Sequence, residues 1–380
     1  MRIALVHSFY SSQQPSGENR VVEHQAELLA GAGHAVEIVG RSTDECETSP
    51  LYRTRTTARV ASGIGANPLR RLEQLKPDIV HIHNLFPNFA TRWVRSWGGP
   101  SVVTLHNYRS VCSRADLYRQ GHYCQECVDF GDHRAIVHAC YRNSRLATLP
   151  VAVSRASFQR DVLQAAAAIV TTSTPSDALL QRLFDGALRT TVIPNPGSDT
   201  VEGIHPVHAR SGWIAMGRFT EEKGFTELVH DWPHGESLSI VGSGPLESEL
   251  KQFAIPKSIS IEPSMPIGDL REYIGKFKGL IFPSRWIEVA PQVVVEAMQA
   301  GLPVIAYEAN GVSELVAQTG TGLAYRDSHS LEQALIGVTQ DLDRYSSAAR
   351  NYYRSHWTAQ IWLESITRLY DQILSARSGG

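Results

Sequence analysis

Glu288 and Glu296, with seven residues between them, flank Pro291 in the segment Glu-Val-Ala-Pro-Gln-Val-Val-Val-Glu. Pro291 favours the first turn of a helix, where a missing N–H costs little. The free backbone N–H groups at that end of a helix attract an anion such as a phosphate. Carboxylates on either side of the anion could bind hydroxyl groups. The segment therefore suits a molecule that has a diphosphate between two sets of hydroxyls, which is the layout of a nucleotide sugar.

Further motifs surround this pair of glutamates. Phe282-Pro283-Ser284-Arg285-Trp286 precedes it, and Gly301-Leu302-Pro303, Gly311, Glu314 and Gly320-Thr321-Gly322 follow it. Elsewhere the chain has Ser16-Gly17, Gly33-His34-Ala35-Val36, Leu105-His106-Asn107, Met216-Gly217-Arg218-Phe219, Lys223-Gly224 and Val241-Gly242-Ser243-Gly244-Pro245. Together these motifs resemble those of the retaining glycosyltransferases of family 4, which have the GT-B fold. The resemblance covers most of the chain and is most specific around the two glutamates.

The resemblance implies how a sugar donor would be bound. In the family, an Arg and a Lys at the motif positions of Arg218 and Lys223 bind the diphosphate, and such fixed cations can stabilise a leaving diphosphate without a metal. Glu288 would hydrogen-bond the donor sugar, and Glu296 would accept hydrogen bonds from the ribose. The other positions implied for donor binding are Gly17, Gly217, Gly242, Gly244, Met265, Val289, Ala290 and Pro291.

His106 matches the family histidine that binds a hydroxyl of the donor sugar near the reacting carbon, so it is grouped with the catalytic residues. The next position is often Asp in the family and is Asn107 here. The family usually has two adjacent glycines where this chain has Ser16-Gly17, so Gly17 fits an ordinary loop glycine equally well. Gly242 and Gly244 are also compatible with a plain turn.

The loop 107–150 is the expected acceptor region, because the first domain binds the acceptor in GT-B enzymes. Asn107, Tyr108 and Arg109 are the candidate contacts. The loop also holds cysteines in the pattern C-x11-C-x2-C-x12-C, namely Cys112, Cys124, Cys127 and Cys140. A structural zinc and reduced cysteines in a small core explain this pattern equally well, and a redox device is a weaker third interpretation. Disulfides are not expected in a cytoplasmic protein.

Apolar runs alternate with amphipathic segments, which predicts βαβ units and parallel sheets. The expected strands are Arg2–His7, Ala35–Val39, Asp78–His83, Ser101–His106, Val151–Ser154, Ala168–Ser173, Gly212–Gly217, Ser237–Val241, Ser258–Glu262, Gly279–Pro283, Pro303–Tyr307 and Gly322–Tyr325. The predicted fold class is α/β, GT-B, with two doubly wound Rossmann-like domains facing across a cleft that would hold both substrates. The first, acceptor-binding domain spans residues 1–197 and the nucleotide-sugar domain spans 210–357, with a linker near 195–210. In the family, the final helix, here 358–380, crosses back to the first domain.

Composition restricts the classes of partner. The 380 residues are 42% hydrophobic and 19% charged, as in a soluble two-domain protein, and a net charge of −2 gives no basis for binding nucleic acid. The first 200 residues hold 21 of the 36 Lys and Arg residues but 17 of the 38 Asp and Glu residues, so this half is basic. It presents either a solvated surface or a face for an anionic membrane or a diphosphate-linked acceptor. No apolar stretch suits a membrane span, so the expected location is cytoplasmic, with peripheral contact at the inner face of the membrane as an option.

The sequence therefore predicts a retaining, metal-independent glycosyltransferase that requires no cofactor. The donor would be a nucleotide diphosphate sugar, with UDP favoured over GDP. The acceptor would be a glycan, a lipid-linked molecule or a small molecule in the synthesis of a polysaccharide, glycolipid or glycosylated metabolite. No residue can be assigned as a carboxylate nucleophile, so front-face attack is the favoured mechanism. A GT-B sugar-nucleotide epimerase and a catalytically silent nucleotide-sugar-binding subunit are the alternatives.

Overall fold

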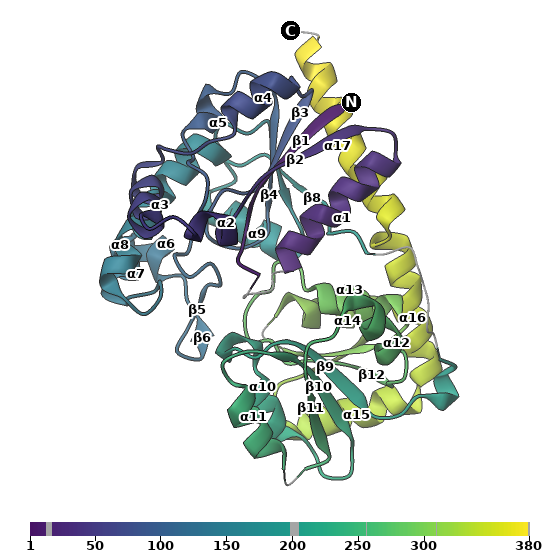
Figure 1. The fold of residues 1–380 in the computed structure, drawn as a ribbon. Helices are drawn as coiled ribbons and strands as arrows, with labels where there is room; N and C mark the ends of the chain where they lie inside the picture. The colour runs from purple at the N-terminus through teal and green to yellow at the C-terminus, as the bar shows by residue number, and fades with distance from the viewer. Residues whose placement is uncertain (13–16, 198–204, 256, 309, 379–380) are drawn as a thin grey trace. The chain divides into compact units, whose positions relative to one another are not determined.

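Two six-stranded parallel sheets carry the fold, one in each of two units (Figure 1). The computed structural model describes residues 1–12, 17–197, 205–255, 257–308 and 310–378. The first unit comprises Met1–Leu117, Cys124–Pro196 and Trp362–Gly380, and the second comprises Tyr118–Tyr123 and Gly197–Ile361. Ser16 and residues 198–204 of the linker predicted near 195–210 lie outside the described residues.

The first sheet has the strand order β2-β1-β3-β4-β7-β8, and its paired strands are all parallel. Its strands are β1 (Arg2–Phe9), β2 (Ala35–Ser42), β3 (Ile79–Asn84), β4 (Ser101–Leu105), β7 (Ala168–Thr171) and β8 (Thr190–Val192). The chain moves from β1 to β2 on one side and then to β3 on the other. Ligands of doubly wound sheets bind beyond the carboxyl ends of the strands at such a reversal, which here lies at the ends of β1 and β3.

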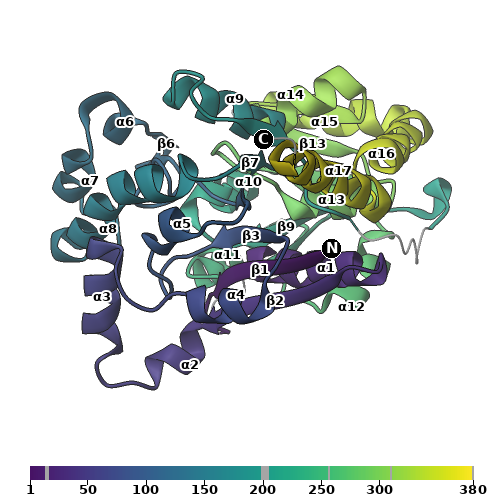
Figure 2. The same cartoon turned by 90° about the horizontal axis from the view of Figure 1, so that it is seen from above.

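Helices flank this sheet, and the last helix of the chain is one of them. They are α1 (Gly17–Gly31), α2 (Thr43–Glu47), α3 (Tyr52–Ser62), α4 (Leu69–Leu75), α5 (Trp93–Ser96), α6 (Glu126–Phe130), α7 (His133–Val137), α8 (Arg145–Phe158), α9 (Thr174–Leu183) and α17 (Ala359–Ser378). Trp362, Ile366 and Tyr370 of α17 pack in one core with Ile3 and Leu5 of β1, and α17 lies beside α1 and β1 in Figure 1. Figure 2 shows α2 and α3 beyond the end of β2.

Val151–Ser154 was predicted as a strand, but this segment belongs to α8. Ser144 caps the helix by accepting a hydrogen bond from the Ala147 N–H at 3.3 Å. Val151 is buried whereas Val153 is 52% exposed. A short apolar run alone does not distinguish a strand from a buried helix turn, so the prediction was wrong. Three short strands also have no counterpart among the predictions: β8 and the hairpin of β5 (Tyr118–Arg119) and β6 (His122–Tyr123).

The second sheet has the order β11-β10-β9-β12-β13-β14 and is also parallel. Its strands are β9 (Trp213–Arg218), β10 (Leu238–Ser243), β11 (Ile259–Glu262), β12 (Gly279–Phe282), β13 (Val304–Tyr307) and β14 (Gly322–Tyr325). The direction of connection reverses between β9 and β12. The predicted α/β class with two doubly wound parallel sheets is therefore confirmed.

Alternate residues of β9 enter two separate cores, because successive side chains of a strand point to opposite faces. Ile214 and Met216 pack with residues of α13 (Gln292–Gln299), α14 (Gly311–Thr319) and α16 (Leu342–His356). Trp213 and Ala215 pack with residues of α10 (Phe225–Asp231), α11 (Glu247–Ala254) and α15 (Ser328–Gln340). The remaining helix of this unit with α-helical hydrogen bonding among the described residues is α12 (Ile267–Ile274). Helices on both faces leave the carboxyl ends of the strands for ligand binding.

Candidate active site

Close backbone packing shapes the carboxyl ends of β9 and β10. A Cβ atom on Gly242 would lie 1.9 Å from the carbonyl oxygen of Gly217, and one on Gly244 would lie 2.6 Å from that of Phe219. Gly217 and Gly244 have φ angles of 153° and 156°, which side chains rarely allow. These predicted donor-site glycines therefore have a structural reason to be glycine.

Lys223 and Glu288 meet beyond the ends of β9 and β12, the two strands between which the second sheet reverses. The ammonium of Lys223 forms an ion pair with Oε1 of Glu288, which is 8% exposed. The same carboxylate oxygen accepts a hydrogen bond from the Ser284 hydroxyl at 2.8 Å. Asn310 holds this segment in turn, since its amide donates to the Ser284 carbonyl oxygen at 2.7 Å. The structure thus brings Glu288 together with Lys223, one of the two cations predicted to bind the diphosphate.

Each cation of this region is positioned by backbone structure. Lys223 ends a 3-10 turn, Glu221–Lys223, and Gly224 follows it with a φ of 70°. The Lys223 ammonium lies 5.3 Å from the centre of the Trp286 ring, a distance that allows a cation–π interaction. Arg218 is the last residue of β9, and its side chain is exposed. A ligand beyond the strand ends could therefore reach both cations.

Pro291 lies one position before the predicted helical turn, as the N-cap residue of α13, because the helix begins at Gln292. Its carbonyl oxygen accepts hydrogen bonds from the N–H groups of Val294 at 3.0 Å and Val295 at 3.4 Å. Glu296 lies on the same helix and is partly buried. The start of α13 and Glu296 are thus held by one rigid element that follows Glu288.

The other predicted donor contacts differ in exposure. Val289 is only 4% exposed, and Ala290 is partly buried. Met265, in the loop after β11, is partly buried and packs against the core that contains Ile214. Gly17 begins α1 in the first unit, and a Cβ atom on it would have no heavy atom within 4 Å. Glycine is therefore not required at position 17 by close packing, unlike at positions 242 and 244.

In the first unit, His106 belongs to a group of four histidines from three neighbouring strands. His83 Nδ1 lies 2.9 Å from His106 Nε2, and their rings are stacked. The ring of His81 lies 4.2 Å from that of His83 and the ring of His7 lies 6.4 Å from it, measured between centroids. His81 is fixed by the hydroxyls of Thr104 at 2.7 Å and Tyr370 at 2.6 Å. We call His7, His81, His83 and His106 the histidine cluster.

Burial keeps this cluster uncharged at neutral pH. It lowers the pKa of His7 to about 4 and those of His81 and His106 to about 3, and repulsion by the neighbouring histidines adds to the effect at His106. The pKa of His83 is also lowered, by burial and by its histidine neighbours. His106 can therefore act as a neutral hydrogen-bonding group rather than as a cation.

The predicted acceptor contacts lie around a buried carboxyl group. Asn107 donates to Glu18 Oε2 at 3.3 Å and accepts from the Arg109 N–H at 3.0 Å. Burial raises the pKa of Glu18 to about 8, although its hydrogen bond to Asn107 and the charge of Arg109 act in the opposite direction. The Arg109 guanidinium stacks 4.2 Å from the centre of the Phe86 ring. Tyr108 is only 1% exposed and contributes to the interior of the unit.

Sequence reasoning did not single out several residues of these groups. Ser284 lies within one of the motifs but had no predicted role, and the His-x-His pattern of His81 and His83 was not interpreted. Glu18 could have been found because it directly follows Gly17 at the start of α1. The contacts of His83 with His106 and of Glu18 with Asn107 join segments that are distant in sequence, whereas Ser284 binds Glu288 only four positions away.

The four loop cysteines lie close enough to interact electrostatically. Burial, with a smaller contribution from the charges of Cys112, Cys127 and Cys124, raises the pKa of Cys140 to about 12. All four are free thiols of intermediate exposure. Among the residues that the structure describes, no group of three or more His, Cys, Asp or Glu is arranged to hold a metal ion. The zinc interpretation stays a prediction.

A metal-dependent transferase would usually have an Asp-x-Asp element, and none was expected in this chain. That expectation was wrong, because Asp341-Leu342-Asp343 is such a sequence. It lies at the start of α16, where Asp341 is exposed and pairs with Arg344 at 3.5 Å. It is therefore not at a strand end beside the predicted donor residues. No helix within the described ranges is both long and apolar enough to cross a membrane.

Comparison with known proteins identifies the family. Residues 16–196 match the family described as "Glycosyl transferase 4-like domain", and residues 210–341 match "Glycosyl transferases group 1". Glycogen synthase of Mycobacterium tuberculosis is 22% identical, over an alignment that covers 100% of this chain and 96% of that protein.

Solved structures share the fold. Sucrose-phosphate synthase from Thermosynechococcus elongatus has a TM-score of 0.71 and 19% identity, with 99% of each chain covered. Anabaena HepE, solved in complex with UDP, has a TM-score of 0.62 and 17% identity, with 98% of this chain and 100% of that chain covered. The two family matches and the shared fold show that this chain belongs to the GT4-type glycosyltransferases with the GT-B fold.

Proposed function

We propose that this protein transfers a sugar from a UDP-sugar to a hydroxyl acceptor, with retention at the anomeric carbon and without a catalytic metal. The observation that carries the proposal is the ion pair of Lys223 with Glu288 beyond the ends of β9 and β12, with Arg218 at the end of β9. A cation beside a carboxylate suits the junction between a diphosphate and a sugar, because one group binds phosphate oxygens and the other binds hydroxyls.

The proposed roles follow the order of groups in the donor. Arg218 and Lys223 stabilise the negative charge that develops on the leaving diphosphate. The first N–H groups of α13 provide further donors for a phosphate oxygen. Glu288 accepts hydrogen bonds from the donor sugar, and Glu296 accepts them from the ribose. His106, uncharged at neutral pH, hydrogen-bonds a hydroxyl of the donor sugar.

UDP is the proposed nucleotide because a protein of the same fold, Anabaena HepE, was solved with it. The acceptor would belong to the synthesis of a polysaccharide, a glycolipid or a glycosylated metabolite. Two proteins similar to this chain have names that indicate such products. Glycogen synthase is named for a polysaccharide, and sucrose-phosphate synthase is named for a small metabolite.

Retention is proposed to proceed by front-face attack, in which the leaving phosphate helps to take the proton of the acceptor hydroxyl. A double displacement would need a carboxylate nucleophile behind the anomeric carbon. Mass spectrometry of the protein after reaction with a 2-fluoro sugar nucleotide tests this step. A covalent glycosyl-enzyme would overturn the front-face mechanism, and unmodified protein that still turns over the natural donor would support it.

Calorimetric titration with UDP, GDP, ADP and TDP, with and without EDTA, tests the nucleotide and the metal together. We expect UDP to bind most tightly and EDTA to leave its affinity unchanged. Glu296→Ala should weaken UDP binding by about 1–3 kcal/mol, because a charged acceptor for the ribose hydroxyls is lost. Glu332→Ala, an exposed change on α15, is the matched control. Unchanged affinity in Glu296→Ala would refute the ribose role.

Product analysis separates the two alternative functions. An epimerase would convert the sugar nucleotide in the absence of any acceptor. A catalytically silent subunit would bind the donor but release no nucleotide with any acceptor tested. Transfer to an acceptor with release of UDP excludes both.

A further inference from the structure

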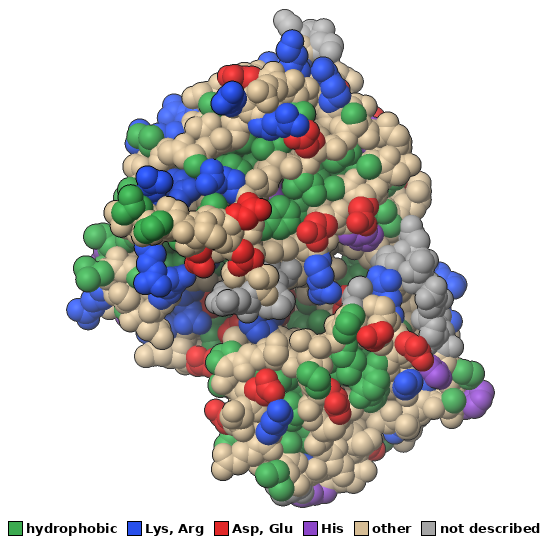
Figure 3. All heavy atoms as spheres, viewed as in Figure 1, with side chains coloured by type: hydrophobic (Ala, Val, Ile, Leu, Met, Phe, Trp, Pro, Cys, Tyr) green, Lys and Arg blue, Asp and Glu red, His purple; other side chains and the backbone are tan. Residues whose placement is uncertain are grey.

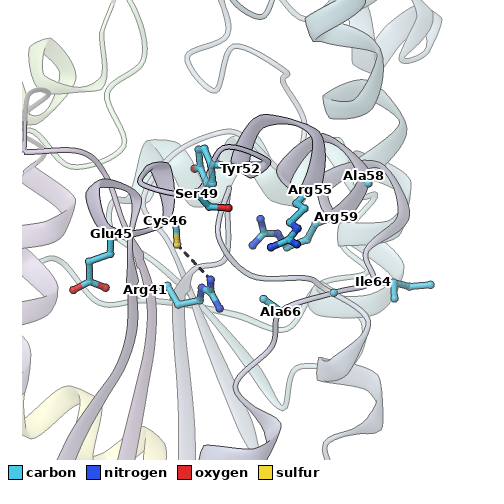
Figure 4. Close-up of a pocket in the computed structure, with 11 residues that line it drawn as sticks. Arg41, Glu45, Cys46, Ser49, Tyr52, Arg55, Ala58, Arg59, Ile64 and Ala66 are labelled. Carbon is cyan, nitrogen blue, oxygen red and sulfur yellow. Dashed lines mark hydrogen bonds between the residues drawn. The ribbon is translucent and has the colours of Figure 1, made fainter.

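A pocket of about 720 Å³ lies in the first unit, outside the groups described above. Its lining comes from the end of β2, from α2 and α3, and from residues 64–66. Pockets of this size hold small ligands or the head of a larger one. Figure 4 shows the guanidinium groups of Arg41, Arg55 and Arg59 in the middle of the group, while the carboxylate of Glu45 points away from them. We call it the arginine pocket.

Among the described residues, no acid forms an ion pair with Arg41, Arg55 or Arg59, although Glu45 also lines the pocket. Arg59 is only 6% exposed and donates to neutral groups, the Asn88 carbonyl oxygen and the Thr56 hydroxyl, each at 2.8 Å. Arg41 donates to the sulfur of Cys46 at 3.4 Å. Burial and the neighbouring Arg41 lower the pKa of Arg59, which is the direction expected where like charges gather.

Buried donors remain in this pocket. The Nε atoms of Arg41 and Arg59 are shielded from solvent and make no hydrogen bond to any described residue. Buried donors without acceptors are costly in a folded protein. An anion with several oxygens would satisfy them, and arginine forks match phosphate oxygens better than a single point charge does. Figure 3 shows further Lys and Arg side chains on the side of the first unit that carries α3.

The position of the pocket relates it to the acceptor end of the sheet. Arg41 lies near the carboxyl end of β2, and His106 directly follows β4. In the order β2-β1-β3-β4, three strand spacings separate these ends. This corresponds to about 14 Å across the sheet. An acceptor that reached from the pocket to a donor sugar beside His106 would therefore have to extend over about 14 Å.

We propose that the arginine pocket binds a phosphate or diphosphate group of the acceptor, so that the acceptor substrates of this enzyme are phosphorylated. This rests on the proposed function for the identity of the second substrate. Ser49 and Tyr52, which also line the pocket, offer hydroxyls to the same group. The separation of about 14 Å favours an elongated acceptor, such as a sugar attached to a diphosphate.

Titration with inorganic pyrophosphate tests the pocket directly. The protein is first saturated with UDP, so that the donor site cannot bind the probe. Arg55→Gln is the main variant, because Arg55 is exposed and its loss should leave the fold intact. Arg53→Gln removes the same charge from the same helix at a residue that does not line the pocket, and it is the matched control. We expect Arg55→Gln and Arg41→Gln to weaken pyrophosphate binding at least tenfold and Arg53→Gln to change it less than twofold.

The source of the phosphate is distinguished by two more probes, geranyl diphosphate and vesicles of phosphatidylglycerol. Tighter binding of geranyl diphosphate than of pyrophosphate, lost in Arg55→Gln, supports a lipid-linked acceptor. If geranyl diphosphate and pyrophosphate bind with equal affinity, and Arg55→Gln abolishes the binding of both, the result supports a soluble phosphorylated acceptor. Vesicle binding that falls equally in Arg53→Gln and Arg55→Gln, without pyrophosphate binding, would overturn the pocket in favour of surface attraction.

UDP affinity separates a failure of this proposal from a failure of the proposed function. If every variant binds UDP and pyrophosphate as tightly as the wild type does, the proposed role of the arginine pocket fails, and the proposed function is unaffected. Loss of UDP affinity in Arg55→Gln would overturn the pocket as an acceptor site. If no nucleotide binds the wild type, the proposed function fails, and the pyrophosphate comparison between Arg53→Gln and Arg55→Gln still decides the pocket.

Discussion

Lys223 and Glu288 form an ion pair although 65 positions of sequence separate them. The pair joins the loop after β9 to the segment after β12, and Ser284 binds the same carboxylate oxygen at 2.8 Å. A lysine held in this way would be oriented before the proposed diphosphate binds. Preorganised charges stabilise developing negative charge better than mobile ones do.

Lys223→Ala should reduce both turnover and stability. Loss of the cation should lower kcat by roughly 100-fold, as expected for the loss of a preorganised electrostatic group. The free energy of unfolding should fall by about 1–3 kcal/mol, because Glu288 is left buried without its cation. Kinetic assays and urea denaturation measure the two effects. Lys251→Ala breaks an exposed pair with Glu247 and should change neither appreciably. A Lys223→Ala protein with wild-type stability and turnover would contradict the assigned role.

The histidine cluster should make the fold sensitive to acid. The pKa values of His7 and His81 are lowered to about 4 and about 3 in the folded protein, from an ordinary value of 6.5. The unfolded chain therefore binds more protons below pH 6.5, and stability should fall as the pH decreases from 6.5 towards 4. At pH 5, each of these two histidines should lower the free energy of unfolding by roughly 2 kcal/mol.

Urea denaturation between pH 7.5 and 5 measures this dependence. His81→Gln should flatten the curve, whereas His208→Gln, at an exposed position, should leave the slope unchanged. A stability that does not change between pH 7.5 and 5 would show that the cluster is solvated in solution.

Glu18→Gln should stabilise the protein at neutral pH, and its advantage over the wild type should grow as the pH rises towards 8. Burial raises the pKa of Glu18 to about 8, so its carboxyl is protonated at neutral pH, and an amide resembles that form. The stability contributed by the protonated carboxyl is complete below the ordinary pKa near 4.5 and is lost as the pH rises through about 8. Thermal unfolding of both proteins from pH 6 to 9 should therefore show a decline only in the wild type. Parallel curves would mean that Glu18 is ionised throughout.

Cys127 and Cys140 should resist alkylation in the native protein. Burial is the main reason that the pKa of Cys127 is raised to about 11 and that of Cys140 to about 12, and the thiolate is the reactive form. Cys46 lies outside the loop and accepts a hydrogen bond from Arg41, so it should react first. Mass spectrometry after iodoacetamide treatment at pH 7.5, with and without urea, measures the order. Zinc analysis of the same sample decides between a structural zinc site and reduced cysteines in a small core. Rapid labelling of Cys140 in the native protein would contradict both of these interpretations.

The strands and the parallel architecture could be predicted because apolar runs and helical periodicity are local patterns. β9 and β12 were predicted almost to the residue, and their following loops contained the residues of the ion pair. Val151–Ser154 failed because four apolar or small residues look alike in a strand and in a helix turn. The stacking of His83 on His106 could not be predicted, since it depends on the pairing of β3 with β4 rather than on either sequence alone.

The contact of Tyr370 with His81 has a consequence for how the chain folds during its synthesis. The core beside β1 is completed by Trp362, Ile366 and Tyr370, and all three are made after the entire second unit. At ribosomal rates, synthesis of residues 197–361 takes roughly 10–30 s. During that interval Ile3 and Leu5 have neighbours made earlier, such as Val22 and Leu29, but lack those from α17, so the domain that begins first is completed last.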